Sequence, residues 1–194
     1  MSEEVKIIEV EARAGTGKGA SRATRRAGLL PGVIYGNKQA PVIINISPKI
    51  LWSELNKSGF FTRLYDVKLE GKVERVLPRA VQMHPVTDRP LHVDFMRVSA
   101  DARIHVKVPL VFDNEATSPG IKKGGVLNAV MHEVELVCSP ANIPHAIHID
   151  IKEMDIGASV HIRDLKLPEG VRAVEAAAAT VISIAPPTVS AKEG

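Results

Sequence analysis

Short strand-like segments, separated by turns that contain Gly or Pro, recur along this chain and restrict its fold more than any other feature. VKIIEVEAR at residues 5–13 and RPLHVDFMRV at 89–98 alternate in side-chain character, and APVIINIS at 40–47 is strand-like too. A period of two is typical of a strand with one buried face. The sequence therefore predicts a mainly β fold with a few helices, in the α+β class.

The character of the chain changes near residue 100. The segments ARIHVKVPLVF, HEVELVCSP, HAIHIDI, SVHIRDL and AATVISIA follow there as short strands between turns, which favours a second, all-β module. We expect a first domain at residues 1–99, a second at 100–186 and a disordered tail at 187–194. SPGIKKGGVLN, at 118–128, is expected to be an exposed loop, and the single Cys138 a buried strand residue.

Two helices are expected in the first half. KGASRATRRAG, at residues 18–28, has good helix formers, a candidate cap at or just before Ser21 and a terminating Gly28. Pro31-Gly32 is then expected to break the chain before a short strand, VIYG.

The second helix is predicted in SPKILWSELNKSG, at residues 47–59. Ser47 suits the N-cap, Pro48 the first helical position and Gly59 the stop. The segment after it is predicted to form a hairpin that turns at Glu70-Gly71.

Charge is distributed unevenly between the two halves. Residues 1–99 contain 16 Lys and Arg against 10 Asp and Glu, a balance of +6, whereas residues 100–194 contain 9 against 12, a balance of −3. No acidic residue lies between Glu11 and Glu54, and the basic residues in that interval are Arg13, Lys18, Arg22, Arg25, Arg26, Lys38 and Lys49. This division indicates a polyanionic partner for the N-terminal half.

The glycine-rich stretch GTGKGAS does not match a nucleotide-binding motif. A phosphate-binding loop needs four residues between its first glycine and Gly-Lys, followed by Ser or Thr, but Gly15 is only two residues before Gly17 and Lys18 is followed by Gly19. A dinucleotide fingerprint needs a third glycine where Ala20 stands. Both nucleotide hypotheses fail on spacing.

A less specific interpretation of this stretch remains. A glycine-rich turn lets backbone amides approach phosphates, and Lys18, Arg22 and Arg25 share one face of the helix that follows. Tyr35 adds an aromatic ring suited to a ribose or a base edge. Basic residues with one aromatic nearby favour recognition of the backbone and shape of an RNA.

Four segments also resemble a known family. GKGASR, PGVIYG, VQMHPV and LHVDFMRV follow one another as do the signature segments of the CTC family of bacterial large-subunit ribosomal proteins, which bind 5S ribosomal RNA. Residues 100–190 resemble the extra β-domain of its two-domain members. The resemblance implies a small N-terminal β-barrel with helices, and a non-enzymatic structural component of the ribosome.

The resemblance also implies which residues contact RNA. They are Arg13, Lys18, Ser21, Arg22, Arg25, Tyr35, Gln82, His84, His92 and Asp94. Asp94 is expected to be hydrogen-bonded before RNA arrives, because a bare carboxylate is unfavourable at an RNA surface. Arg26 has no counterpart in the family and is expected to be solvated.

We expect no cofactor, no metal and no membrane contact, and a monomer off the ribosome. The start MSEEVKIIEV lacks the basic and apolar regions of a signal peptide, so a cytoplasmic location is expected. The C-terminal domain is a candidate for contact with neighbouring ribosomal proteins. An interaction protein of the stress response that uses the acidic half is compatible with this hypothesis.

An iron oxygenase is the alternative from a different class. His92-Val-Asp94 has the H-x-D spacing of a two-histidine, one-carboxylate iron site, and histidines follow at positions 105, 132, 145, 148 and 161. This alternative leaves the basic helix unexplained, and most of these histidines fall in the second module.

Overall fold

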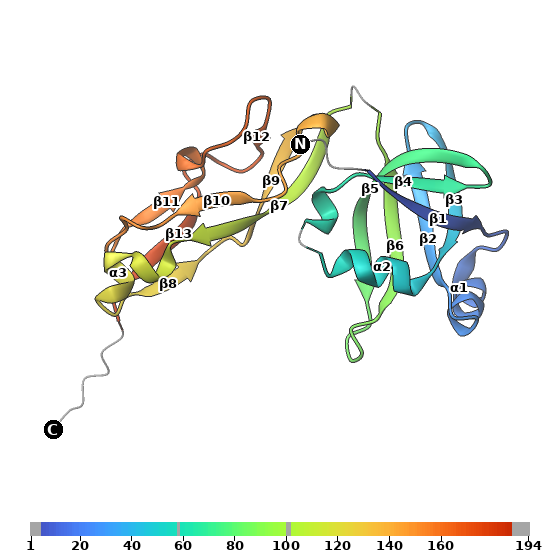
Figure 1. Ribbon diagram of the computed structural model, residues 1–194, viewed down its shortest axis with the longest axis horizontal. Helices are drawn as coiled ribbons and strands as arrows, with labels where there is room; N and C mark the ends of the chain where they lie inside the picture. The colour runs from blue at the N-terminus through green and yellow to red at the C-terminus, as the bar shows by residue number, and fades with distance from the viewer. Residues whose placement is uncertain (1–4, 58, 100–101, 188–194) are drawn as a thin grey trace. The chain divides into compact units, whose positions relative to one another are not determined.

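The computed structural model describes residues 5–57, 59–99 and 102–187 (Figure 1). The chain divides into two compact units, Met1–Arg103 with Ser139–Ile143, and Ile104–Cys138 with Pro144–Gly194. The predicted tail from residue 188 onward lies outside the described residues, as do residues 100 and 101. No helix in the described ranges is long and apolar enough to cross a membrane.

The first unit is built around a closed barrel with the strand order β1-β3-β2-β6-β5-β4. The strands are β1 Lys6–Ala12, β2 Leu30–Gly36, β3 Gln39–Ile46, β4 Tyr65–Leu69, β5 Lys72–Met83 and β6 Pro90–Arg97. The helices are α1 Gly17–Arg26, α2 Pro48–Leu55 and the 3₁₀ turn Phe60–Thr62. The pairs β1–β4 and β2–β6 are parallel and the other neighbours antiparallel. The predicted barrel with helices, in a mainly β chain, is confirmed.

Alternate residues of each strand fill the barrel, because successive side chains of a strand point to opposite faces. The fully buried set includes Ile8, Ile34, Ile44, Ile46, Tyr65, Val67, Val76, Val93 and Phe95, with Leu51 added from α2. The odd-numbered residues of β6 face inward, so its even-numbered residues face outward. This alternation decides which side chains of β6 are exposed on the outer surface of the barrel.

The predicted chain break at Pro31-Gly32 is wrong, because both residues lie within β2 and are buried. A Cβ atom at position 32 would stand 2.9 Å from the carbonyl oxygen of Val93 and 3.2 Å from the side chain of Ile44. The glycine is therefore required by the close approach of β2 to β6 and β3, and not by a turn. In the sequence alone, a Pro-Gly pair inside a strand cannot be distinguished from a Pro-Gly pair in a turn.

The boundaries of the helices were predicted in part. The N-cap of α1 is Thr16, without a side-chain cap bond, so the expectation of a cap at or near Ser21 is wrong, while Gly28 follows the helix in the left-handed region with φ +77°. In α2, Ser47 is the N-cap and Pro48 opens the helix as predicted, but the helix ends at Leu55, before Gly59.

The turn at Glu70-Gly71 is confirmed. It joins β4 to β5, and both residues have positive φ, 49° and 83°. Two consecutive positive φ values are the mark of the hairpin turn whose twist matches that of the flanking strands.

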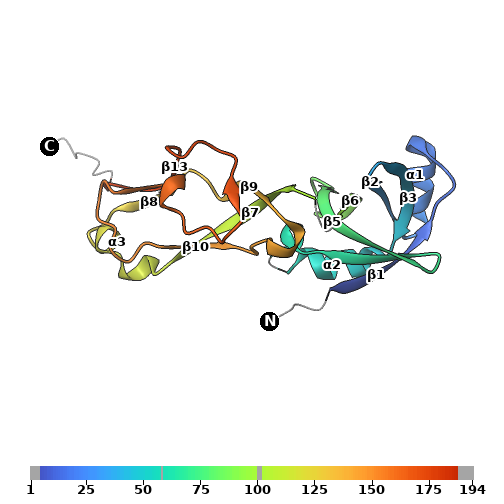
Figure 2. The ribbon, with the colours of Figure 1, turned by 90° about the horizontal axis from the view of Figure 1, so that it is seen from above.

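The second unit contains two sheets, with strand orders β10-β7-β9-β12 and β11-β13-β8. Its strands are β7 Ile104–Asp113, β8 Val126–Ala129, β9 Glu133–Cys138, β10 Ile147–Asp150, β11 Ser159–His161, β12 Arg172–Ala173 and β13 Thr180–Ala185. The short helix α3 Pro119–Lys122 lies beside β8, as Figure 2 shows, and the unit also contains the 3₁₀ turns Glu115–Thr117 and Ile162–Asp164. A further 3₁₀ turn, Pro140–Asn142, belongs to the first unit. Cys138 is buried at the end of β9, as predicted.

The expectation of an exposed loop at residues 118–128 is wrong. This segment forms α3 and most of β8, and Ser118 is fully buried with its hydroxyl donating to the carbonyl oxygen of Met154 at 2.7 Å. A Cβ at Gly120 would lie 2.9 Å from the backbone of Asp155. Glycines that permit close packing were mistaken for glycines of a loop.

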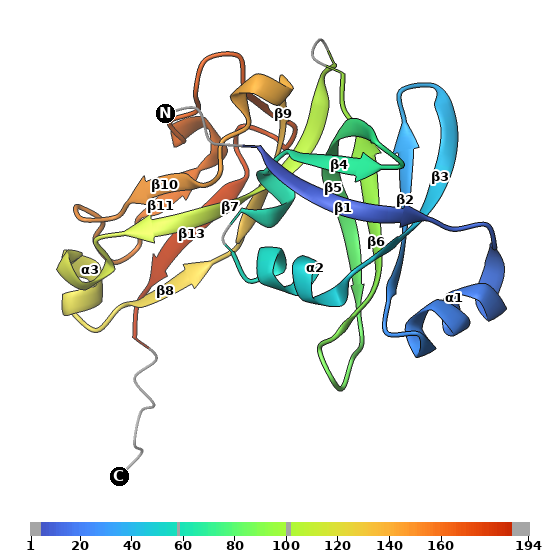
Figure 3. The same cartoon turned by 45° about the vertical axis from the view of Figure 1, so that its right-hand side comes forward.

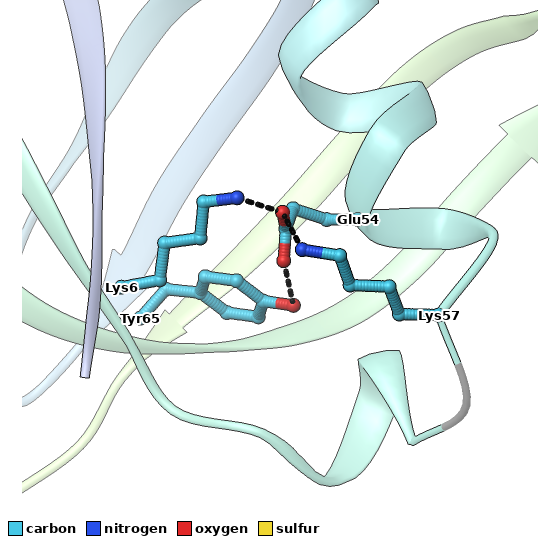
Figure 4. A network of polar contacts seen from close by, with 4 residues as sticks. All are labelled: Lys6, Glu54, Lys57 and Tyr65. Atoms are coloured by element: carbon cyan, nitrogen blue, oxygen red, sulfur yellow. Dashed lines mark hydrogen bonds and ion pairs between the residues drawn. The ribbon is translucent and has the colours of Figure 1, made fainter. Parts of the chain in front are cut away.

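A buried carboxylate joins α2 to two strands of the barrel (Figure 4). The Glu54 side chain is fully buried; it accepts hydrogen bonds from Lys6 of β1, from Lys57 Nζ at 2.8 Å and from the hydroxyl of Tyr65 at 3.4 Å. Burial alone would raise the pKa of Glu54, but the hydrogen bonds from Lys57 and Lys6 outweigh it and hold the pKa below its usual value. Burial, followed by the negative charge of Glu54, raises the pKa of Tyr65 to about 12.

We predict that Glu54→Gln lowers the free energy of unfolding by about 1–3 kcal/mol at neutral pH, because it leaves two lysines without their anionic acceptor. The folded-state pKa of Glu54 is lowered, so its contribution is present above the unfolded pKa near 4.5 and is lost as pH falls through the folded value. Denaturant titrations at several pH values should show the difference between wild type and variant shrinking in acid. Glu9→Gln, at the exposed Glu9–Lys68 pair, is the matched control and should have little effect. An undiminished gap at low pH would contradict this account.

Candidate nucleic-acid interface

The exposed face of α1 is basic. Lys18, Arg22 and Arg25 are three or four positions apart and solvent-exposed, while Thr24, on the other side of the helix, is buried. Within the described ranges, no carboxylate pairs with Lys18, Arg22 or Arg26. Unneutralised cations on one rigid surface create a positive potential that attracts polyanions.

Two arginines attach α1 to the barrel. Arg13 follows β1 directly; its backbone amide donates to the carbonyl of Ile43 at 2.9 Å, and its guanidinium reaches the hydroxyls of Ser21 at 3.3 Å and Thr24 at 3.4 Å. Arg25 donates to the carbonyl oxygen of Leu91 in β6 at 3.1 Å. Figure 3 shows α1 beside the barrel, connected to β1 and β2. Arg13 and Ser21, two of the residues predicted to contact RNA, therefore form a hydrogen bond with each other.

The strand residues of the predicted site share the outer face of β2, β6 and β5. Ile34, Val93 and Phe95 point into the core, so Tyr35, His92 and Asp94 point outward. Their strands are adjacent, because Tyr35 is in register with Met96 and Gln82 is in register with His92. The barrel thus brings together residues that are up to 59 positions apart in the sequence, from Tyr35 to Asp94.

Two small residues on this face were missed by sequence reasoning. Val33 of β2 and Ala80 of β5 are both in register with Asp94. Both residues are apolar, so neither can offer the Asp94 carboxylate a hydrogen bond from its side chain. Only strand register reveals these neighbours, so the sequence carried no signal for them.

His92 and Asp94 form a pair on the outer surface. His92 Nδ1 lies 2.6 Å from Asp94 Oδ1, and both side chains are about a third exposed or less. Asp94 therefore has His92 as a close polar neighbour, while the hydrogen bond expected for its carboxylate stays a prediction.

His84 lies apart from this pair, in the turn that joins β5 to β6. Its ring Nδ1 accepts hydrogen bonds from the backbone amides of Val86 and Thr87, each at 3.2 Å. One nitrogen of the ring is thus engaged within the turn. Of the ten predicted residues, Arg13 and Ser21 bond to each other, Arg25 bonds to Leu91 and His84 bonds within its own turn. Lys18 and Arg22 project without a partner among the described residues.

The structure gives the oxygenase hypothesis no support. In the ranges that the structure describes, no group of three or more His, Cys, Asp or Glu residues is placed to hold a metal ion. His148 and His161 each pair with a carboxylate, Asp113 and Asp164 respectively, in the second unit.

A closed barrel has here a basic helix beside outward aromatic, amide and imidazole groups, and such a basic face is typical of the class of proteins that bind nucleic acids. Comparison with known proteins identifies the family. The family model "Ribosomal L25p family" matches residues 8–95, and "Ribosomal protein TL5, C-terminal domain" matches residues 103–188.

Relatives match over nearly the whole chain. A "Large ribosomal subunit protein bL25" of Paramagnetospirillum magneticum is 58% identical over 100% of this chain and 96% of its own length. Proteins of the same name from Novosphingobium aromaticivorans and Bradyrhizobium diazoefficiens are 47% and 46% identical, over 96% and 97% of this chain and 93% and 79% of their own lengths. This chain belongs to the bL25 family of large ribosomal subunit proteins.

Family membership confirms several predictions. The resemblance to the CTC family was correct, and the chain is a ribosomal protein of the large subunit and not an enzyme. Its location is the ribosome, which in bacteria lies in the cytoplasm.

We predict that Arg13→Met loosens α1 without unfolding the barrel, because it removes the bonds to Ser21 and Thr24 while keeping most of the apolar stem. Amide hydrogen exchange should become roughly three- to tenfold faster in the last turn of α1. Arg22→Met is the matched control, since Arg22 projects from the same helix without a partner, and it should leave exchange unchanged. Equal exchange in both variants would refute the role assigned to Arg13.

Proposed function

We propose that this protein binds 5S ribosomal RNA in the large subunit through its first unit. The observation that carries the proposal is the exposed face of α1, whose cations Lys18 and Arg22 have no carboxylate partner in the described ranges, next to the outer face of β2, β6 and β5. Membership of the bL25 family supports an RNA partner, and the resemblance noted above indicates which RNA. We define the RNA face as α1 together with the outward residues Tyr35, Gln82, His92 and Asp94.

The role of α1 is to anchor the RNA backbone. Lys18, Arg22 and Arg25 neutralise phosphates, and arginine can grip a phosphate through two parallel hydrogen bonds. Neutralised phosphates release counterions, so binding through this helix depends strongly on salt and little on sequence. Because Arg13 and Arg25 fix α1 against β1 and β6, the anchored backbone has a defined position relative to the strands.

The role of the strand residues is to test the local geometry of the RNA. Tyr35 offers a hydroxyl and a ring face, and Gln82 can both donate and accept at a base edge. A neutral His92 has one donor and one acceptor nitrogen, so it can bond to a ribose hydroxyl or a base edge, while its Nδ1 lies 2.6 Å from Asp94 Oδ1. These contacts contribute preference for one RNA shape, whereas the phosphate contacts contribute affinity.

The second domain, residues 100–186, is proposed to contact neighbouring proteins of the large subunit. Its half of the chain has a balance of −3, which disfavours broad contact with phosphates. Within this proposal the first domain, residues 1–99, suffices for RNA binding, and the protein is a monomer off the ribosome without a cofactor.

We predict that single substitutions separate the two roles. Arg22→Ala should weaken binding to 5S RNA and to an unrelated structured RNA by a similar factor, roughly three- to tenfold, because it removes a phosphate contact. Tyr35→Phe and Asp94→Ala should weaken mainly the 5S complex, which lowers the ratio of the two affinities. Filter-binding or fluorescence titrations at one fixed salt concentration measure both.

Lys72→Ala is the control for loss of a positive charge. Lys72 is exposed at the start of the twelve-residue β5, about 30 Å along the strand from Gln82, and its removal should change neither affinity appreciably. Titration curves that do not move with Tyr35→Phe or Asp94→Ala would show that the RNA face is assigned to the wrong strands.

A further inference from the structure

The turn between β5 and β6 is closed by a single residue, His84. Its backbone amide donates to the carbonyl of Arg89 at 2.8 Å, and its carbonyl accepts from the amide of Asp88 at 3.0 Å. Its ring Nδ1 accepts from Val86 and Thr87. Asp88 has φ +50°, in the left-handed region that Asp adopts more readily than most residues with a side chain.

These bonds give the turn one shape without help from packing. Val86, at its tip, is 82% exposed, so no apolar contact fixes it. Backbone amides only donate, so Nδ1 has to present its lone pair and a neutral ring carries its proton on Nε2. A residue used for a direct base contact alone would have no need to accept two amides of its own turn.

The turn lies next to the RNA face. Met83 is in register with Pro90, and the next pair of the ladder is Gln82 with His92, with an irregularity in register between residues 82 and 83. The turn therefore sits one step beyond two proposed RNA contacts, at a point where the strand ladder is already irregular. A change in its shape would shift Gln82 against His92.

We propose that His84 is a positioning residue: through Nδ1 it fixes the β5–β6 turn and so holds Gln82 in alignment with His92 on the RNA face. The inference rests on the proposed function and refines it, because it assigns His84 a role distinct from the direct contact implied by the family resemblance. The role requires an acceptor at the place of Nδ1, whereas a direct contact would require a polar group at the place of Nε2.

Three variants of the full-length protein distinguish these requirements. In His84→Asn the amide oxygen stands near the place of Nδ1, in His84→Gln near the place of Nε2, and His84→Ala has neither. We expect His84→Asn to keep the hydrogen-exchange protection of the Val86 and Thr87 amides and the wild-type preference for 5S RNA over an unrelated RNA, both within about twofold. His84→Gln and His84→Ala should lose protection and lower that preference by roughly three- to tenfold.

The opposite ranking, with His84→Gln like wild type and His84→Asn impaired, would overturn the proposal in favour of a direct contact through Nε2. Loss of amide protection with an unchanged RNA preference would overturn it as well. If His84→Ala does not fold, the Asn and Gln variants still decide. A wild-type protein with no preference for 5S RNA would reject the proposed function, and the amide protection, measured without RNA, would still show whether His84 fixes the turn.

Discussion

The close approach of β2 to β6 is the contact on which the rest of the first unit depends. At Gly32 there is no room for a side chain, because the backbone and side chain of Val93 occupy it. This approach sets the parallel register in which Val33 lies beside Asp94, and β5 continues the same outer face with Gln82 beside His92. Since each strand alternates between core and solvent, packing inside the barrel determines which side chains are presented outside it.

In the proposed complex with RNA, affinity and selectivity come from different elements of this unit. The helix α1 carries cations that have no carboxylate partner in the described ranges. The hydrogen bonds of Arg13 and Arg25 hold this helix against the barrel, so its charges lie at a fixed place. The strand face carries few charges, and some of its polar groups contact one another, as His92 and Asp94 do. Electrostatic attraction acts over about a Debye length, ~8–10 Å, whereas hydrogen bonds act only on contact. In the proposed complex, the cations of α1 therefore attract the RNA and the strand residues discriminate between RNAs.

Much of the fold could be predicted from local signals. Alternation located the barrel strands from VKIIEVEAR to RPLHVDFMRV, and Glu70-Gly71 marked a hairpin whose positive φ values the structure contains. Two of the errors share one cause: the sequence around Gly32 and Gly120 predicts a turn or loop, although each glycine stands where another segment packs against its backbone. The network of Glu54 also left no signal, because its burial depends on partners from β1 and β4. The residues of the candidate site could be predicted from the sequence and the family resemblance. Their common face on the barrel and the hydrogen bonds of Arg13 and His84 could not, because these depend on strand register and turn geometry, which only the folded chain defines.

The central claim is that the cations of α1 supply affinity for RNA and the strand residues supply selectivity. It is tested most directly by measuring, for the full chain, how the affinities for 5S RNA and for an unrelated structured RNA depend on salt. If α1 anchors phosphates in both complexes and the strands discriminate, both affinities fall along similar slopes as salt rises, and their ratio stays well above one and nearly constant. A 5S affinity that ignores salt, or a ratio that falls to one at moderate salt, would contradict the account.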